Sequence, residues 1–184
     1  MRAPIGDFTD ARPAPDRLDL LTGPVADTAV FVEHHGAGLL DASANCVVVA
    51  ARRGGDTTLA ACAVGSATRV DVNGVVRRHL GARKASFALT DMATGESGME
   101  CGGITPVGLP AAWPLLVDAA VVDMPWVLVG SGRRRGKPIL PGKALGQLPG
   151  AVVLEGLGVP VTREGRGASG GSGSDAPRGE SGGS

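Results

Sequence analysis

The chain has 184 residues, with 18 Lys and Arg against 18 Asp and Glu, so its formal net charge at pH 7 is zero. This length suits one domain with or without a tail, and neutrality argues against a histone-like DNA-wrapping protein or an acidic disordered chain. With three Phe, two Trp and no Tyr, the sequence also argues against a base-stacking sheet or a carbohydrate groove.

The predicted elements begin with two helices. Residues 16–22 form a short helix candidate that is stopped by Gly23 and Pro24. Residues 25–35 carry apolar side chains at helical spacing, which predicts an amphipathic helix that ends at Gly36.

A β-hairpin and a capped helix are expected next. The β-branched run 46–50 indicates a buried strand, which the turn signal at 54–56 connects to a partner strand over 57–64. Asp71 is a good N-cap for a helix over 72–80, and Gly81 would end that helix.

Short strands and helices fill the rest of the chain. They are expected as a strand at 85–88, a helix at 90–97, strands at 115–122, 126–129 and 138–140, a helix at 141–148 and a strand at 151–154. Because strands and helices do not alternate strictly, this order favours a mixed α+β domain over a doubly wound parallel sheet. No G-x-G-x-x-G or Walker lysine motif supports a nucleotide-binding fold.

The two ends of the chain are predicted to lie outside the folded domain. Residues 163–184 contain eight Gly and five Ser without apolar periodicity, which predicts a disordered tail. Residues 1–14 are expected to be loose, and one domain spans residues 15–160. The neutral total hides an asymmetry, because residues 1–45 carry a balance of −4 and residues 46–150 a balance of +5. Such a basic body suits an anionic partner, although an ordinary solvated surface is equally compatible with it.

The cysteines and the apolar runs bear on location. Three cysteines cannot form a closed disulfide framework, and no C-x-x-C pair is present. Cys46 and Cys62 lie in apolar runs typical of small buried residues, whereas Cys101 precedes two glycines. No apolar run approaches the length of a membrane span, and no secretory signal is recognisable. We expect a cytoplasmic protein without a membrane partner.

The segment 99–110 (MECGGITPVGLP) is the most unusual in the sequence. Paired glycines allow a tight turn and a close approach to a ligand, and exposed N–H groups there can receive a carboxylate, phosphate or ester oxygen. The alternative is a plain Gly/Pro loop. A second segment, 130–137 (GSGRRRGK), follows a strand and carries four cations that suit a phosphate backbone or a solvated loop. A further basic cluster comprises Arg77, Arg78, Arg83 and Lys84.

Other catalytic arrangements find little support. His34 and His35 are adjacent and lack a partner at ligand spacing, so no metal site or cofactor is expected. Cys101 has no identifiable base, and Ser131 lies outside a G-x-S-x-G elbow.

Five segments together resemble the YbaK / prolyl-tRNA-synthetase-associated domain family over about residues 25–157. They are ANCVVVAARRGG, DVNGVVRRHLGARKASFA, ESGMECGGITPVGLP, PLLVDAAVV and VLVGSGRRRG. The most specific element is GGITP at 102–106, which matches the family's G-x-x-x-P loop. The resemblance implies an α+β domain around a strongly curved, partly closed mixed sheet surrounded by helices.

The resemblance also implies trans-editing, the hydrolysis of the ester that joins a wrong amino acid to tRNA. The implied partners are the aminoacylated acceptor end of tRNA and an aminoacyl-tRNA synthetase, and the oligomeric state is left open. The implied catalytic residues are Gly102, Gly103, Ile104, Thr105, Pro106 and Asn45, and the implied substrate-binding residues are Asp118, Ser131, Gly132, Arg133 and Lys84. In this mechanism backbone N–H groups hold the ester and a positioned water attacks it.

One position departs from the family pattern. Many members have a lysine where this sequence has Asn45, and an amide can donate a hydrogen bond but brings no positive charge. The alternative function is therefore a non-catalytic module that binds tRNA or an aminoacyl-nucleotide. A third and weaker hypothesis is a scaffold protein that binds a partner through its Gly/Ser-rich tail.

Overall fold

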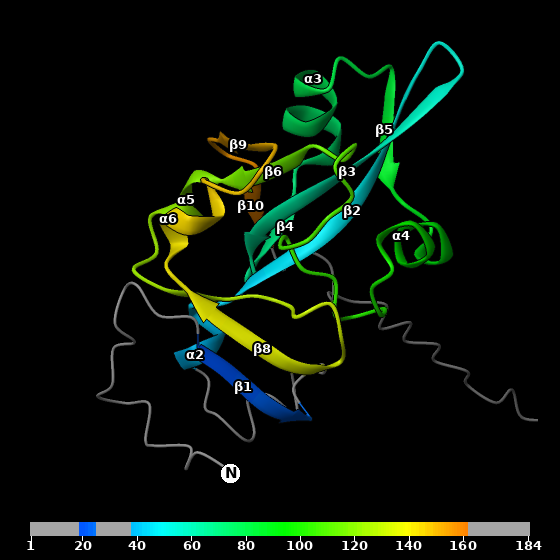
Figure 1. Cartoon of the computed structure of the whole chain (residues 1–184). Coiled ribbons are helices and arrows are strands. Elements are labelled where there is room, and N and C mark those ends of the chain that lie inside the picture. Colours follow the sequence, from blue (N-terminus) through cyan, green and yellow to red (C-terminus); the bar gives the residue numbers. More distant parts are fainter. Residues whose placement is uncertain (1–18, 25–37, 162–184) are drawn as a thin grey trace, which may run out of the picture.

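The computed structural model describes residues 19–24 and 38–161 (Figure 1). The strands are β1 (Asp19–Pro24), β2 (Ala44–Arg53), β3 (Asp56–Gly65), β4 (Thr68–Val70), β5 (Lys84–Phe87), β6 (Leu115–Asp118), β7 (Val127–Leu128), β8 (Arg135–Leu140), β9 (Ala151–Leu154) and β10 (Gly158–Pro160). The helices are α2 (Gly38–Asp41), the π-helical η1 (Val72–Val76), α3 (Arg77–His79), α4 (Thr90–Ser97), α5 (Ala119–Val122) and α6 (Gly142–Leu145).

The main sheet has five strands in the order β5-β2-β3-β6-β9. Its first half is antiparallel, because β2 pairs with both β3 and β5 in that sense, and its second half is parallel, from β3 through β6 to β9. β3 lies in the middle, and its run Leu59–Val64 is buried throughout. A strand covered on both faces needs this continuous apolar sequence. The predicted mixed α+β fold and the 46–64 hairpin are confirmed.

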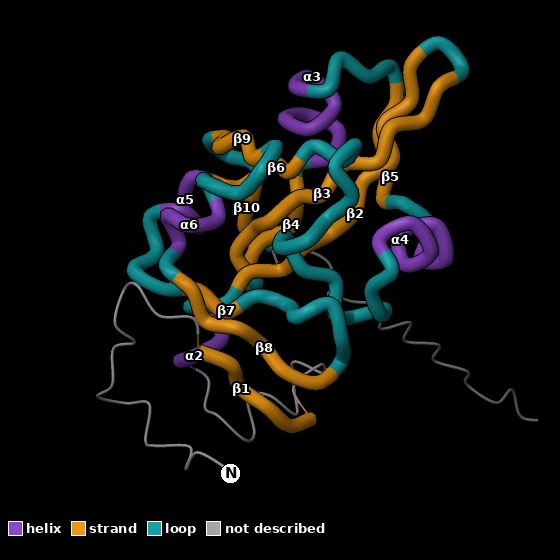
Figure 2. Tube along the Cα trace, viewed as in Figure 1, coloured by secondary structure: helices purple, strands orange, loops and turns teal. Residues whose placement is uncertain are grey.

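The expectation of a strongly curved, partly closed sheet is wrong. The sheet is open, and its edge strands β5 and β9 each pair with a single neighbour (Figure 2). To close into a barrel, a sheet must tilt its strands relative to the barrel axis until its two edge strands pair with each other. Here β5, β6 and β9 have four residues each, which is too short for that wrap. Few helices accompany the sheet in the described ranges, and the longest, α4, has eight residues.

The two faces of the sheet support separate cores. Alternate side chains of β2 point to opposite faces, so Val48 and Ala50 join one cluster with Leu115 and Val117, while Val49 joins the other. The second cluster packs beneath η1, whose Val72 and Val76 are buried. Both faces of the sheet are thus apolar at its centre.

The N-terminal prediction of a helix over 16–22 is wrong for its described part. Residues 19–24 form strand β1, which pairs antiparallel with β8, Leu20 opposite Pro138. A segment this short does not form a stable helix by itself, and pairing with β8 determines its conformation. β8 also pairs with β7, so the three strands form a second sheet, and β4 pairs with β10 in a third.

Asp71 caps the predicted helix, and its carboxylate accepts hydrogen bonds from the N–H groups of Gly74 (2.9 Å) and Val75 (3.0 Å). The first turn is π-helical, because the Val76 N–H donates to the Asp71 carbonyl (3.1 Å). Gly81 follows the helix with a φ of +58°, as a helix-ending glycine should.

The strand predicted at 115–122 is half as long as expected. β6 ends at Asp118, whose side chain caps α5, so residues 119–122 are helical. The helix predicted at 141–148 is likewise shortened to α6. The elements predicted at 85–88, 90–97, 126–129, 138–140 and 151–154 are confirmed within a few residues, and α2, β4 and β10 were not foreseen.

Several expectations lie outside the described residues: the loose segment 1–14, the helix over 25–35 with His34 and His35, and the tail 163–184. Across the ranges that the structure covers, every helix is too short or too polar to cross a bilayer.

Candidate functional site

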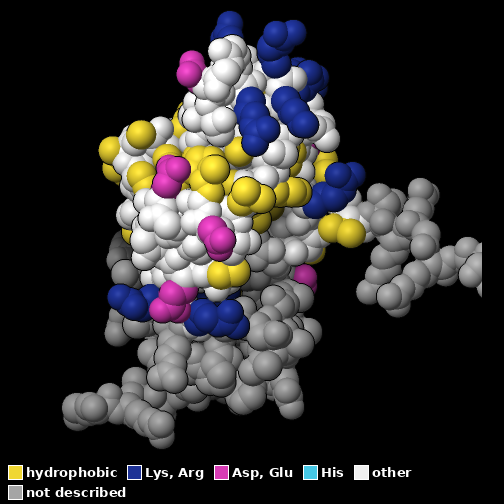
Figure 3. All heavy atoms as spheres, turned by 90° about the vertical axis from the view of Figure 1, so that its right-hand side faces the viewer, with side chains coloured by type: hydrophobic (Ala, Val, Ile, Leu, Met, Phe, Trp, Pro, Cys, Tyr) yellow, Lys and Arg dark blue, Asp and Glu magenta, His cyan; other side chains and the backbone are white. Residues whose placement is uncertain are grey.

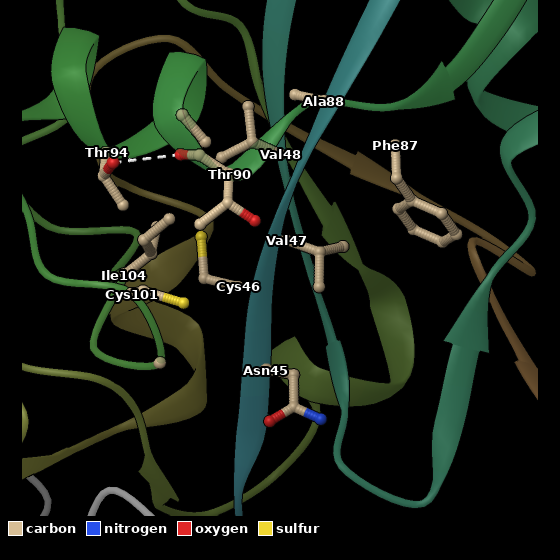
Figure 4. A pocket seen from close by; sticks show the side chains of 12 residues that line it. Asn45, Cys46, Val47, Val48, Phe87, Ala88, Thr90, Thr94, Cys101 and Ile104 are labelled. Atoms are coloured by element: carbon tan, nitrogen blue, oxygen red, sulfur yellow. Dashed lines mark hydrogen bonds between the residues drawn. The ribbon is translucent and has the colours of Figure 1, made fainter.

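A cavity of about 330 Å³ opens where β5 separates from β2 (Figure 4). The β2–β5 pairing stops at Val49 and Phe87, and one further bond joins the Ala88 N–H to the Val48 carbonyl (2.9 Å). The chain then leaves the sheet to form α4. The residues that line the cavity are Asn45, Cys46, Val47, Val48, Phe87, Ala88, Thr90, Ala93, Thr94, Cys101, Gly102 and Ile104.

The cavity wraps around the free edge of β2. Cys46 lies on the side of Cys101 and Ile104, whereas Val47 lies on the other side with Phe87 (Figure 4). The Val48 carbonyl points toward β5, and peptide groups two residues apart in a strand point the same way. The N–H and C=O groups of Cys46 therefore face the open edge, so polar backbone is available beside an apolar wall.

The loop Gly102–Pro106 is held from behind by the segment 130–134. Gly103 is buried, and a Cβ built on it would lie 2.6 Å from the carbonyl carbon of Arg133. A Cβ on Gly130 would lie 2.5 Å from the Ile104 carbonyl oxygen. The Gly132 N–H donates to the Gly103 carbonyl (2.7 Å). Two backbone segments thus touch at positions where a side chain has no room.

Two N–H groups of this loop remain available. The Gly103 N–H donates to the Glu100 carbonyl (2.9 Å), and the Thr105 N–H is directed at the sulfur of Met99 (3.5 Å). By contrast, in the part of the chain that the structure describes, the N–H groups of Gly102 and Ile104 have no acceptor. Both residues line the cavity, so these two N–H groups lie beside it.

The cavity is electrically neutral, because no charged side chain is among the described residues that line it. The Thr94 hydroxyl donates to the Thr90 carbonyl (2.9 Å) within α4. Burial raises the pKa of the Cys46 thiol far above its usual range and that of Cys62 to about 12, so both are uncharged thiols at neutral pH. Within the described ranges, no three His, Cys, Asp or Glu residues are placed to hold a metal.

A family model described as "Aminoacyl-tRNA editing domain" matches residues 22–145. The chain belongs to this family. The match spans more than half of the sequence and confirms the resemblance that the five segments indicate. A search of curated proteins found no match.

Solved structures share the fold of this editing domain. The hypothetical protein APE2540 superimposes with a TM-score of 0.68 at 21% identity, over 78% of this chain and 92% of the other. A candidate trans-editing enzyme for prolyl tRNA synthetase gives 0.62 at 21% identity, over 75% and 85%. At this identity the likeness establishes the fold.

The structure brings together several of the site residues that the sequence indicates. Asn45, Gly102 and Ile104 line the cavity. Gly103, Thr105 and Pro106 are the buried residues of the loop, and Ser131, Gly132 and Arg133 belong to the segment that supports it.

Two expected substrate-binding residues lie elsewhere in the editing domain. Lys84 begins β5, three residues before Phe87, and is exposed. Asp118 is buried, and its carboxylate accepts hydrogen bonds from the N–H groups of Ala120 (3.0 Å) and Gly158. Neither lines the cavity, and a role in binding substrate stays a prediction for both.

Sequence reasoning missed Glu100 and most of the cavity wall. Glu100 accepts a hydrogen bond from the Arg134 N–H (2.7 Å) and forms an exposed ion pair with Arg133 (3.6 Å), which ties the loop to its support. An exposed ion pair contributes about 0–1 kcal/mol to stability, so this one serves mainly to position the loop. The wall residues Thr90 and Ala93 carry no sequence signal, because only the departure of α4 from β5 brings them there.

Proposed function

We propose that this protein is an aminoacyl-tRNA deacylase that hydrolyses mischarged aminoacyl-tRNA. Membership of the editing-domain family supports it. The observation that carries it concerns the N–H groups of Gly102 and Ile104, which lie beside a neutral cavity and have no acceptor among the residues that the structure describes. Donors fixed in a folded loop stabilise an oxyanion without reorganising when charge develops.

The reaction needs no group beyond these donors and water. A water oxygen attacks the ester carbonyl carbon, and the carbonyl oxygen becomes an oxyanion that accepts hydrogen bonds from Gly102 and Ile104. The bond from the acyl carbon to the ribose oxygen then breaks. The proton from the water passes to the ribose oxygen, so free tRNA and the free amino acid leave. The amide of Asn45, exposed at the cavity edge, would donate to the ribose hydroxyl or orient the water.

The cavity further favours an uncharged aminoacyl side chain. A buried charge without a partner is costly, and the wall offers none. The α-ammonium group of the substrate instead donates a hydrogen bond to the Cys46 carbonyl at the open edge of β2. Small neutral groups such as Ala, Ser, Thr or Cys are therefore the substrates to test first.

A panel of tRNAs charged with Ala, Ser, Thr or Cys tests the proposal. We expect the protein to deacylate at least one of them faster than buffer alone, because the loop stabilises the oxyanion. A contaminating hydrolase is controlled by a Gly103→Ala preparation purified in parallel. Equal rates with and without protein across the panel would contradict the proposal, and tight tRNA binding without hydrolysis would favour the non-catalytic alternative.

Experiments on Cys101 distinguish two possible attacking groups, a water molecule and the thiol of Cys101. It is exposed and lines the cavity, whereas burial raises the pKa of the Cys62 thiol and of the half-buried Cys46 thiol, so both are protonated at pH 8 and react much more slowly. We expect a single equivalent of iodoacetamide at pH 8 to modify Cys101 first, as mass spectrometry would show, and to block deacylation by filling the cavity. Cys101→Ala should retain most of the activity and resist the reagent. Complete loss in Cys101→Ala would instead identify a thiol nucleophile.

A further inference from the structure

Six exposed cations gather at one end of the main sheet, beyond the cavity. They are Arg52, Arg53, Arg77, Arg78, Arg83 and Lys84, which we call the hairpin-end surface. Figure 3 shows Lys and Arg side chains clustered over the upper part of the face that it draws. The cluster comes from the end of β2, from α3, and from Arg83 and Lys84, which lie just before and at the start of β5.

Contacts in the structure hold these residues together. Arg52 lies opposite Lys84 in the β2–β5 pairing, and the Arg83 N–H donates to the Arg52 carbonyl (2.9 Å). The Arg53 guanidinium reaches Gly81, at 3.2 Å from the position that a Cβ would take. The Arg77 carbonyl accepts from the Ala82 N–H (3.0 Å), which ties α3 to the same corner.

The positive charge of this surface is not neutralised within the described part of the protein. None of the six cations forms an ion pair there. Asp56 lies opposite Arg53 at the end of the hairpin, and the Asp71 carboxylate is engaged by Gly74 and Val75. Like charges directly opposite each other in a sheet are destabilising, as for Arg52 and Lys84. The C-terminus of α3 favours cations nearby, which accounts for Arg77 and Arg78 but not for the strand residues.

The same two strands carry the cations and the cavity wall. Val48 lines the cavity four residues before Arg52, so the separation along β2 is about 13 Å, and from Asn45 it is about 23 Å. Each strand of double-stranded DNA has one phosphate per roughly 3.4 Å of helix axis, and the spacing in an RNA strand is of the same order. These lengths therefore correspond to about four to seven nucleotides leading away from an ester held in the cavity.

We propose that the hairpin-end surface binds the phosphate backbone of the tRNA acceptor arm while the terminal aminoacyl ester occupies the cavity. The proposal rests on the proposed function for the identity of the ligand. Arginine and lysine suit phosphate oxygens, and contacts of this kind position the RNA without reading its bases. The surface supplies affinity for full-length tRNA, and the cavity acts on the ester.

The test compares two full-length variants that remove the same charge. Arg52→Gln/Arg83→Gln alters the hairpin-end surface, whereas Arg69→Gln/Lys143→Gln removes two exposed cations from β4 and α6. We expect the first variant to bind uncharged tRNA about tenfold more weakly at low salt. Its plot of log affinity against log salt should become shallower by about 1.5, since each lost phosphate contact contributes roughly 0.7–0.9. The control should keep both values.

A small substrate separates this proposal from the proposed function. With an aminoacyl-adenosine ester, the first variant should match the unmodified protein, while its kcat/KM for mischarged tRNA falls about tenfold through KM. If the small ester is hydrolysed but tRNA affinity and salt slope are unchanged, the surface proposal is overturned and the deacylase stands. If no ester is hydrolysed, the deacylase fails, and the binding data still decide the surface. Unchanged tRNA affinity with lost binding to anionic phospholipid vesicles would assign the surface to a membrane instead.

Discussion

Gly103→Ala should reduce deacylation by about two orders of magnitude in a protein that still folds. The added Cβ would lie 2.6 and 2.7 Å from the Arg133 carbonyl carbon and oxygen, distances that backbone atoms cannot tolerate. The loop must therefore move away from the segment 130–134 and give up the hydrogen bond from the Gly132 N–H. A displacement of about 1 Å in a catalytic geometry can cost about 100-fold in rate.

Single-turnover deacylation on the best substrate of the panel measures this effect, and a thermal melt checks the fold. Gly130→Ala should act in the same way, because its Cβ would meet the Ile104 carbonyl oxygen from the other side of the same contact. Gly95→Ala is the matched control. Gly95 lies within α4 with nothing within 4 Å of its Cβ position, so the change should leave the rate unaltered and stabilise the helix by up to about 1 kcal/mol.

Wild-type rates in both Gly103→Ala and Gly130→Ala would mean that the loop position does not matter for the reaction. That outcome would rule out the proposal that the Gly102 and Ile104 N–H groups stabilise the oxyanion. Gly102 itself is a less direct probe, because its φ of +79° makes any side chain strained even though the nearest atom is 3.9 Å away. We expect Gly102→Val to cripple turnover while tRNA binding persists. It therefore tests the backbone conformation at Gly102, whereas Gly103→Ala tests the contact between the loop and the segment 130–134.

The sequence contains the signals for the local structure of the site but few for its assembly. Gly102, Gly103 and Pro106 mark the loop, and the β-branched run of β2 marks the strand beside it. Nothing in the sequence indicates that β5 pairs with β2 only up to Val49, yet this early end creates the cavity. The wall of α4 follows from that departure, so no local pattern could predict it.

Errors in the predicted elements have the same origin. The segment 115–122 is uniformly apolar apart from Asp118, and an apolar run does not distinguish a strand from a short buried helix. Asp118 determines the outcome, because its side chain caps α5. Similarly, Leu20 and Leu21 form a strand because β8 is available to pair with them. Whether the sheet stays open or closes depends on the lengths of its strands and on how its edge strands pair. The periodicity of apolar residues does not define either property.

Asp118→Ala should destabilise the domain by about 3 kcal/mol while leaving catalysis by the folded protein intact. Asp118 is 5% exposed, and its carboxylate accepts hydrogen bonds from the N–H groups of Ala120 and Gly158. Removing a helix cap costs about 0.5–2 kcal/mol, and losing a hydrogen bond to a charged group about 1.5–3. The contact also joins the end of β6 to β10, so its loss would loosen the pairing of β10 with β4.

Denaturant unfolding gives the free energy, and the melting temperature should fall by about 10 °C for a domain of this size. Asp123→Ala removes an equal charge from the exposed end of α5 and should change stability by less than about 0.5 kcal/mol. Asp118→Asn should fall between them, because one carbonyl oxygen remains to accept while the amide NH₂ faces the other donor. If Asp118→Ala instead keeps its stability and loses activity well below its melting temperature, Asp118 acts on the substrate, as its place in the family motif implies. A buried carboxylate that caps a helix and holds a distant strand gives the opposite expectation, and the two outcomes cannot be confused.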